Sequence, residues 1–131
     1  MSDGANIFEC NSDTCSECIQ NGLFASNLPW PLEVKTGDIC FLYLFTAGTL
    51  FGVWRAERDG ALNIIPRIWG GRFPFQIKVR LVSSEIVEVP APIVAAIAAD
   101  SSNGRLDNRL DVGRARELLT WAKELGVNLD G

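Results

Sequence analysis

Residues 39–56, with the sequence ICFLYLFTAGTLFGVWRA, decide the fold class. Two apolar runs, 39–45 and 50–56, stand on either side of a short segment that contains Gly48, a pattern typical of an antiparallel β-hairpin. Further along, Phe75, Ile77, Val79 and Leu81 alternate with polar residues, and this period of two predicts a half-buried strand from Phe73 onward. The sequence therefore predicts a core of antiparallel sheet.

Working outward from the hairpin gives the remaining elements. An apolar run predicts a strand at 5–10, and the polar residues after it favour a helix at 13–21 that Gly22 ends. Segments 23–38 and 58–72 are expected to be loops, and a short apolar helix is expected to end near Ala99. A final helix at 112–125 is capped by Asp111. We expect five or six strands, mostly antiparallel and strongly curved, with the 13–21 and 112–125 helices packed on them.

Length and composition indicate one compact domain. The chain has 131 residues, 47% of them hydrophobic, which suffices for a single core, and we place one domain over 1–131 with its core at 5–126. No apolar run is long enough to cross a bilayer, so no membrane partner is expected. The first residues have neither a basic segment nor an apolar one, and the expected location is cytoplasmic.

The charges are unevenly distributed along the chain. The formal net charge is −4, yet between residues 55 and 80 six basic residues accompany only two acidic ones. This segment is a candidate phosphate-binding surface, although six cations on strands and loops also occur on an ordinary solvated surface. The sequence pI near 4.8 argues against strong non-specific binding to nucleic acid.

The absence of histidine limits the chemistry that the chain can perform. Histidine is the usual general base near neutral pH and the usual partner of a Ser or Cys nucleophile. No glycine-rich nucleotide-binding motif is present either. We therefore predict a binding protein rather than an enzyme, with no cofactor.

Four cysteines allow three interpretations. Cys10, Cys15 and Cys18 fall within nine residues and could bind zinc together with Cys40. Cys10 and Cys40, however, lie in apolar runs, where a small buried thiol suits the packing. We predict that these two are buried free thiols and that no metal is bound, with zinc binding and redox chemistry as the alternatives.

Several motifs together resemble a known family, the DCD (development and cell death) domain. The resemblance begins at IFECNSDTCSEC (7–18) and GLF (22–24). It continues through GDICFLY (37–43), LFGVW (50–54), NIIPRIW (63–69) and RFPFQIKV (72–79), and covers roughly residues 5–82. The DCD pattern is in turn similar to the YTH domain. The resemblance implies an α+β fold of the PUA-like (YTH/EVE-like) group, a curved mixed β-barrel with flanking helices.

The resemblance also implies a binding site, because YTH domains hold N6-methyladenine in an aromatic cage. Phe24 and Trp69 would be two walls of such a cage, and Ile64 would replace a further tryptophan. Four more residues would line the base pocket: Asn11, Asp13, Ala25 and Ser26. Phosphate contacts would come from the residues Arg67, Arg72, Lys78, Arg105 and Arg109. Large aromatic side chains such as Phe24 and Trp69 can also be plain core residues.

Three functional classes remain in play at this point, and an enzyme is the least favoured of them. The first is a reader domain that captures a modified, N6-methyladenine-like base on DNA or RNA, within a larger nucleic-acid-targeting protein or fused to a partner. The second is a protein-interaction or regulatory module that does not bind nucleic acid. Two aromatic walls facing each other across a space one base wide would favour the reader.

Overall fold

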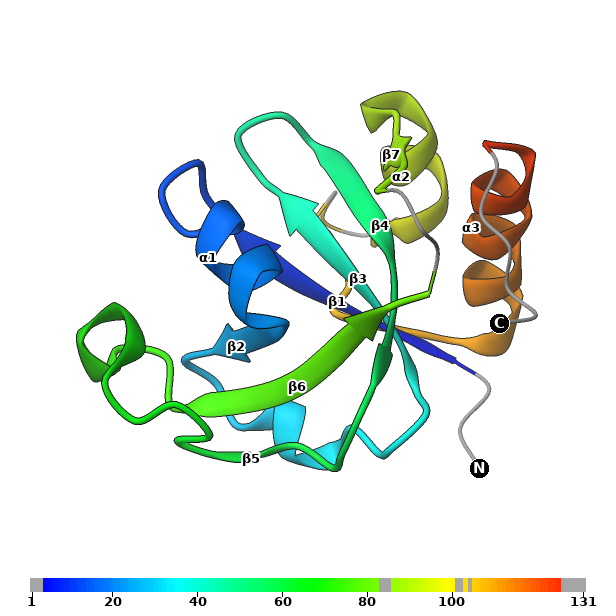
Figure 1. Cartoon of the computed structure of the whole chain (residues 1–131). Coiled ribbons are helices and arrows are strands. Elements are labelled where there is room, and N and C mark those ends of the chain that lie inside the picture. Colours follow the sequence, from blue (N-terminus) through cyan, green and yellow to red (C-terminus); the bar gives the residue numbers. More distant parts are fainter. Residues whose placement is uncertain (1–3, 83–85, 101–102, 104, 126–131) are drawn as a thin grey trace.

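The computed structural model describes residues 4–82, 86–100, 103 and 105–125. Its centre is one strongly curved sheet (Figure 1). The five longer strands are β1 (Ala5–Cys10), β2 (Leu23–Ser26), β3 (Ile39–Leu44), β4 (Thr49–Ala56) and β6 (Phe75–Leu81). They lie in the order β2-β6-β4-β3-β1, and β1 continues to the two-residue strand β8 (Arg109–Leu110). Two further short strands join the sheet, β5 (Ala61–Leu62) beside β6 and β7 (Glu88–Val89) beside β4.

The predicted hairpin is confirmed as β3 and β4. The two strands pair antiparallel with Leu44 opposite Thr49, and a bulge between Cys40 and Leu42 increases the local bend. Gly48 in the connecting turn has φ +74°, a left-handed conformation that glycine adopts without a steric cost. The hairpin therefore holds the middle of the sheet.

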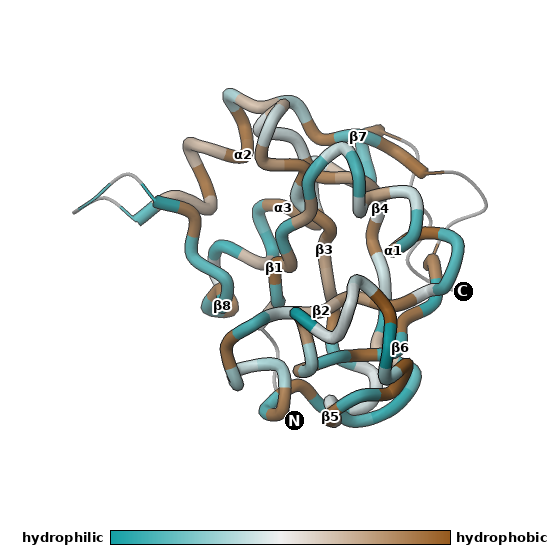
Figure 2. Tube along the Cα trace, turned by 90° about the vertical axis from the view of Figure 1, so that its left-hand side faces the viewer, coloured by the Kyte–Doolittle hydropathy of each residue, from teal (hydrophilic) through white to brown (hydrophobic). Residues whose placement is uncertain are grey.

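The curvature of the sheet creates two hydrophobic cores. One lies outside the curl, where Ile7, Phe41 and Val53 pack beneath α2 (Ala91–Ala98) and α3 (Val112–Glu124). The other lies inside the curl and includes Phe24 and Trp54. Because both faces are covered, the strands are apolar along most of their length, as the hydropathy colouring shows (Figure 2).

The helix α1 (Cys15–Asn21) bridges β1 and β2. Before its first turn, Oδ1 of Asn11 accepts hydrogen bonds from the backbone N–H groups of Asp13 (2.8 Å) and Thr14 (2.9 Å). Gly22 ends the helix with φ +56°, and a Cβ at this position would lie 2.7 Å from the carbonyl oxygen of Val79. The close approach of strand β6 therefore requires glycine here.

The structure confirms the expected class of a curved mixed sheet with flanking helices, and it corrects several details. The predicted loop 23–38 contains strand β2 and the short 3-10 helix η1 (Trp30–Glu33). The predicted loop 58–72 contains β5 and the 3-10 helix η2 (Ile68–Gly71). Within the described residues the sheet has eight strands instead of five or six, because the short strands are defined by their pairing and not by a local pattern. Strands β1 and β3 pair in parallel.

None of the helices in the described part of the chain is both long enough and apolar enough to span a membrane.

Candidate nucleic-acid interface

The two end regions of the sheet meet along an unpaired seam between β1 and β2. Neither strand is hydrogen-bonded to the other, although the two lie next to each other (Figure 2). The C=O of Gly22 accepts a hydrogen bond from the N–H of Val79 on β6. Because backbone groups alternate along a strand, those of Phe24 and Ser26 also point toward β6, whereas those of Ala25 point away from it. The N–H and C=O groups of Ala25 therefore point toward the seam.

Strand β1 presents its own backbone groups to the same seam. The C=O of Cys10 accepts from the N–H of Phe45, so this residue faces β3, whereas Ile7 exchanges hydrogen bonds with Asn108 on the opposite edge. Because backbone groups alternate along a strand, the N–H and C=O groups of Glu9 point to the same edge as those of Ile7, away from β3. They lie further along the strand than the hydrogen bonds to Asn108. The backbone groups of Glu9 and Ala25 thus remain available to a ligand.

Two adjoining cavities open at this seam. The first encloses about 250 Å³, space open to solvent included, and is lined by Glu9, Thr14, Cys18, Ala25, Trp69 and Phe73. The second encloses about 440 Å³ on the same basis and is lined by Glu9, Ala25, Ser26, Asn27, Leu28, Trp30, Phe73 and Asn108. The shared residues Glu9, Ala25 and Phe73 join the two cavities into one cleft, which we call the seam cleft.

Trp69 and Phe73 form an aromatic corner in the first cavity. Their ring centroids are 6.0 Å apart and the ring planes meet at 78°. Trp69 has φ +52°, and Gly70 and Gly71 are also left-handed. A left-handed conformation costs a non-glycine residue about 1–2 kcal/mol, and such strain is concentrated at functional sites. In addition, Nε1 of Trp69 is buried without a hydrogen-bond partner in the described part of the chain.

Gln76 attaches the loop that carries Trp69 to strand β6. Its side chain is almost fully buried, and Oε1 accepts from the N–H of Ile65 at 2.8 Å. Nε2 donates to the carbonyl oxygens of Ile65 (3.2 Å) and Phe73 (3.1 Å). One amide therefore holds both ends of the loop that forms the aromatic corner.

We expect Gln76→Leu to lower the free energy of unfolding by about 1–3 kcal/mol, because it leaves buried backbone groups of Ile65 and Phe73 unpaired. The loop should also open more readily, which hydrogen exchange at the Ile65 amide would report as faster exchange. Unchanged exchange at this amide would show that other contacts hold the loop. Asn27→Leu, an amide removed from an exposed position, is the control.

The cysteines lie beside this cleft as thiols. The prediction that Cys10 and Cys40 are buried thiols is confirmed, and Cys18 is buried as well. Burial, with smaller contributions from the neighbouring Cys15 and Glu17, raises the pKa of Cys18 to about 12. Among the described residues, no group of three or more Cys, Asp or Glu side chains is placed to hold a metal ion.

The structure separates the residues predicted for the base pocket. Trp69 and Ala25 line the first cavity, and Ser26 lines the second. Phe24 does not line the cleft: its ring is fully buried and packs against Phe8 (5.6 Å) and Trp54 (5.2 Å). This prediction is corrected, because Phe24 faces the inner core while the neighbouring Ala25 faces the seam.

Three other predicted pocket residues also lie outside the lining. Asn11 uses its side chain to hold the turn before α1, and Asp13 is exposed in the same turn. Ile64 lies in the loop before η2 and lines neither cavity. The cavity is lined instead by four residues that the sequence did not assign to the base pocket, Glu9, Thr14, Cys18 and Phe73.

Of the five predicted phosphate-binding residues, Arg72 lies at the cleft. Its guanidinium carbon is 5.7 Å from the centroid of the Phe73 ring, and its Nε donates to the carbonyl oxygen of Trp69 at 3.1 Å. Arg67 is exposed at the start of η2. Lys78 instead donates to the carbonyl of Asn21 at the end of α1.

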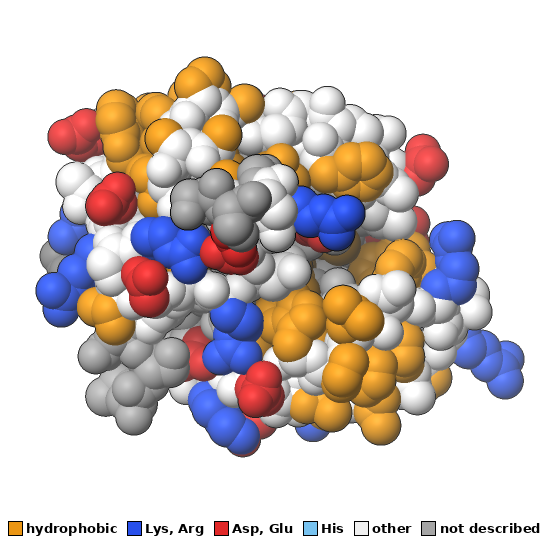
Figure 3. All heavy atoms as spheres, turned by 180° about the vertical axis from the view of Figure 1, so that it is seen from behind, with side chains coloured by type: hydrophobic (Ala, Val, Ile, Leu, Met, Phe, Trp, Pro, Cys, Tyr) orange, Lys and Arg blue, Asp and Glu red, His pale blue; other side chains and the backbone are white. Residues whose placement is uncertain are grey.

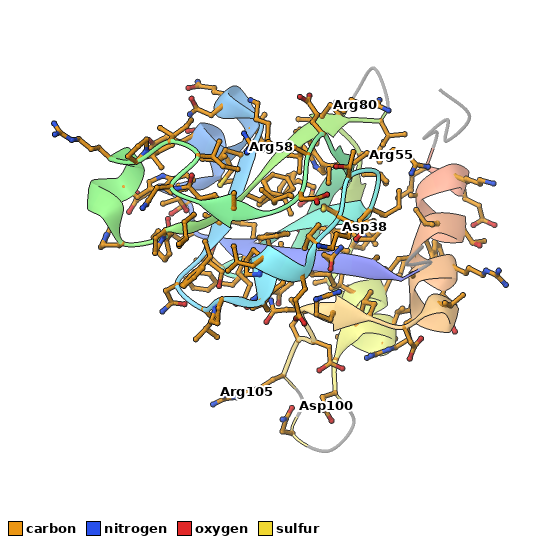
Figure 4. All side chains as sticks on the ribbon, turned by 90° about the horizontal axis from the view of Figure 1, so that it is seen from below. Asp38, Arg55, Arg58, Arg80, Asp100 and Arg105 are labelled. Atoms are coloured by element: carbon orange, nitrogen blue, oxygen red, sulfur yellow. The ribbon has the colours of Figure 1, made fainter. Side chains whose placement is uncertain are left out.

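The remaining basic residues do not form one patch. Arg109 makes an exposed ion pair with Glu33 at 3.4 Å. Arg105 projects from the loop before β8, on the side of the molecule opposite Arg55, Arg58 and Arg80 (Figure 4). The positive segment 55–80 is therefore distributed over several surfaces, with Arg72 as its member nearest the aromatic corner.

Apolar side chains line part of the second cavity. Leu28 is one of them and is 57% exposed. Hydrophobic side chains also gather on the lower part of the face seen in Figure 3. Trp30 packs on Phe8 with a centroid distance of 4.5 Å and also lines this cavity. Its position between two prolines was the only signal in the sequence that pointed to it.

Comparison with known proteins identifies the family. The family model for the development and cell death domain matches residues 4–119. The chain belongs to this family. The DCD domain is 35% identical over 86 residues to the soybean (Glycine max) DCD domain-containing protein NRP-A, an alignment covering 58% of this chain and 23% of that protein. It is 34% identical over 86 residues to the carrot (Daucus carota) B2 protein, covering 58% and 42%. The aligned region thus spans less than half of these relatives.

Solved structures show that the fold of this DCD domain is that of YTH domains. The YTH domain of the Zygosaccharomyces rouxii MRB1 protein, solved with N6-methyladenosine RNA, superposes with a TM-score of 0.65 at 19% identity, covering 97% of this chain and 91% of that one. The Toxoplasma CPSF4 YTH domain, solved with a methylated 7-mer RNA, gives a TM-score of 0.69 at 16% identity, covering 98% and 97%. The expected relation between DCD and YTH folds is confirmed.

Proposed function

We propose that this DCD domain is a non-catalytic reader that captures a methylated base of single-stranded nucleic acid in the first cavity of the seam cleft. The observation that carries the proposal is the aromatic corner of Trp69 and Phe73 facing an unpaired backbone edge. The fold shared with YTH domains solved on methylated RNA supports it.

Each part of the first cavity has a role in such binding. A planar base stacks on an aromatic face, and each stack is worth about 1–3 kcal/mol. The free N–H and C=O groups of Glu9 and Ala25 complement the donors and acceptors on the edge of the base. Cys18 and Phe73 supply apolar surface for a methyl group. The base must be unstacked to enter, which favours a single strand over a duplex.

The alternative, a protein-interaction module, has one observation in its favour. Trp121 and Leu125 on and beside α3 are 40% and 41% exposed and lie one helical turn apart, away from the seam cleft. Contiguous exposed apolar surface marks protein-interaction faces, and these two residues would form the centre of such a face. This surface also provides a control for substitutions in the seam cleft, because Trp121→Ala removes an exposed indole at a distance from the cleft.

A binding screen tests the proposed function. Single strands of RNA and DNA, identical except for one methylated or unmethylated base, are titrated against the full chain. We expect at least one methylated strand to bind more tightly than its unmethylated counterpart. Equal binding across all pairs, or no binding, would reject the reader and leave the interaction module.

Arg72→Ala should weaken methylated and unmethylated strands alike, because a contact with phosphate does not distinguish bases. The slope of log affinity against log salt concentration should fall by about one counterion. Titrations at several salt concentrations measure both effects. Arg80→Ala, which removes an exposed arginine from β6, should leave the slope unchanged, and an equal change in both variants would contradict a specific contact.

A further inference from the structure

The charge of the seam cleft is opposite to what a nucleic-acid site needs for its phosphates. Of the described residues that line the two cavities, Glu9 is the charged one, and it lines both. Its side chain is exposed and makes neither a hydrogen bond nor an ion pair with a described residue. An unpaired carboxylate repels the phosphates next to a bound neutral base and attracts a ligand with a positive charge.

A second acidic residue acts on the wall of the first cavity. Glu17, on the exposed side of α1, contributes to the raised pKa of Cys18, so its negative field reaches the thiol that lines the cavity. The guanidinium of Arg72 lies against the ring of Phe73, and Arg72 is exposed to solvent. Phosphates thus have a cation at the rim, while the cleft itself is lined by an anion.

The aromatic corner fits the same kind of ligand. Tryptophan is the aromatic side chain that attracts cations most strongly, and Trp69 lines the same cavity as Glu9. Methylated cations are bound on the faces of aromatic rings. Adenine methylated at N1 and cytosine methylated at N3 carry such a charge near neutral pH, and both keep amino N–H donors for an acceptor-only carboxylate.

We propose that the seam cleft selects a positively charged methylated base, such as 1-methyladenine, over neutral methylated bases, with Glu9 as the residue that sets this preference. The inference rests on the proposed reader function and names its substrate class. The 1-methyladenine cation differs from neutral N6-methyladenine in one proton and in the position of the methyl group, so a second cationic base, 3-methylcytosine, is needed to separate charge from shape. Such a preference would also exclude unmodified strands, whose bases are neutral.

The test uses the full chain and four single-stranded RNAs of one sequence that carry adenine, 1-methyladenine, N6-methyladenine or 3-methylcytosine at the same position. Titrations are made at neutral pH, where 1-methyladenine stays charged. We expect both cationic bases to bind more tightly than N6-methyladenine. Glu9→Gln should weaken binding of 1-methyladenine by about 10-fold and leave N6-methyladenine unchanged or stronger, because only the charge-assisted hydrogen bond is lost. Glu124→Gln, the same change of net charge on α3, should alter neither.

The outcomes separate this inference from the reader function. If the chain prefers N6-methyladenine and the Glu9→Gln variant does so too, the proposed reader function stands. The inference that the ligand is a cationic base is then wrong. Failure of every strand to bind overturns both. A peptide containing trimethyllysine is the last arm of the test: if it binds while the four RNAs do not, the cleft recognises a cation on protein and the inference about a base is wrong.

Discussion

Phe24→Ala should lower the free energy of unfolding by about 3–5 kcal/mol, because it removes a fully buried ring from the inner core. The ring contacts the rings of Phe8 and Trp54, so its removal leaves a cavity between two large side chains. Urea denaturation followed by tryptophan fluorescence measures the change. A cost of this size would be a large part of the stability of a small domain.

Phe45 provides the matched control, since its ring is 55% exposed at the end of the β3–β4 hairpin. Phe45→Ala should change the stability by no more than about 0.5 kcal/mol. Phe24→Leu, which retains most of the buried volume, should fold and bind nucleic acid like the wild type. A folded Phe24→Leu protein without affinity for any strand would contradict the assignment of Phe24 to the core.

Trp69→Ala should reduce affinity for the preferred methylated strand by about 1–3 kcal/mol, because one stacking surface disappears. The indole is partly buried against the inner core, so its removal also costs some stability, and the left-handed φ of +52° is as strained for alanine as for tryptophan because both carry a Cβ. Isothermal titration at fixed salt measures the affinity, and circular dichroism checks the fold. Trp69→Phe should retain most of the affinity because it retains a ring.

Trp121→Ala is the control for a general effect of losing an exposed indole, and it should bind as the wild type does. If Trp69→Ala folds and binds normally, the aromatic corner is not part of the binding site. If Trp121→Ala loses the binding instead, the surface of α3 is the interface.

Much of the fold could be predicted because the main strands carry their own patterns. The apolar run at 5–10, the hairpin around Gly48 and the alternation after Phe73 are local signals, and each corresponds to a strand. Strand β2 gives no such signal: four residues, Leu23–Ser26, become a strand because β6 supplies the partner. The parallel pairing of β1 with β3 likewise depends on contacts that no local pattern encodes.

The candidate site was only partly predictable, because burial decides what an aromatic residue does. Phe24 and Trp69 both resemble cage residues in the sequence, yet one faces the inner core and the other the seam. Glu9 has the appearance of a solvent-facing strand residue, and its place in the cleft follows from the end of β1 extending beyond its short pairing with β8. Which strands meet at the seam is a property of the whole sheet.

The central claim, that the seam between β1 and β2 is the binding site, can be tested most directly by NMR. The ¹⁵N-labelled chain is titrated with the methylated single strand that binds most tightly in the screen. The backbone amides of Glu9 and Ala25 and the indole N–H of Trp69 should show the largest shift changes. Unchanged signals at these three groups, with shifts confined to α3 around Trp121, would contradict it.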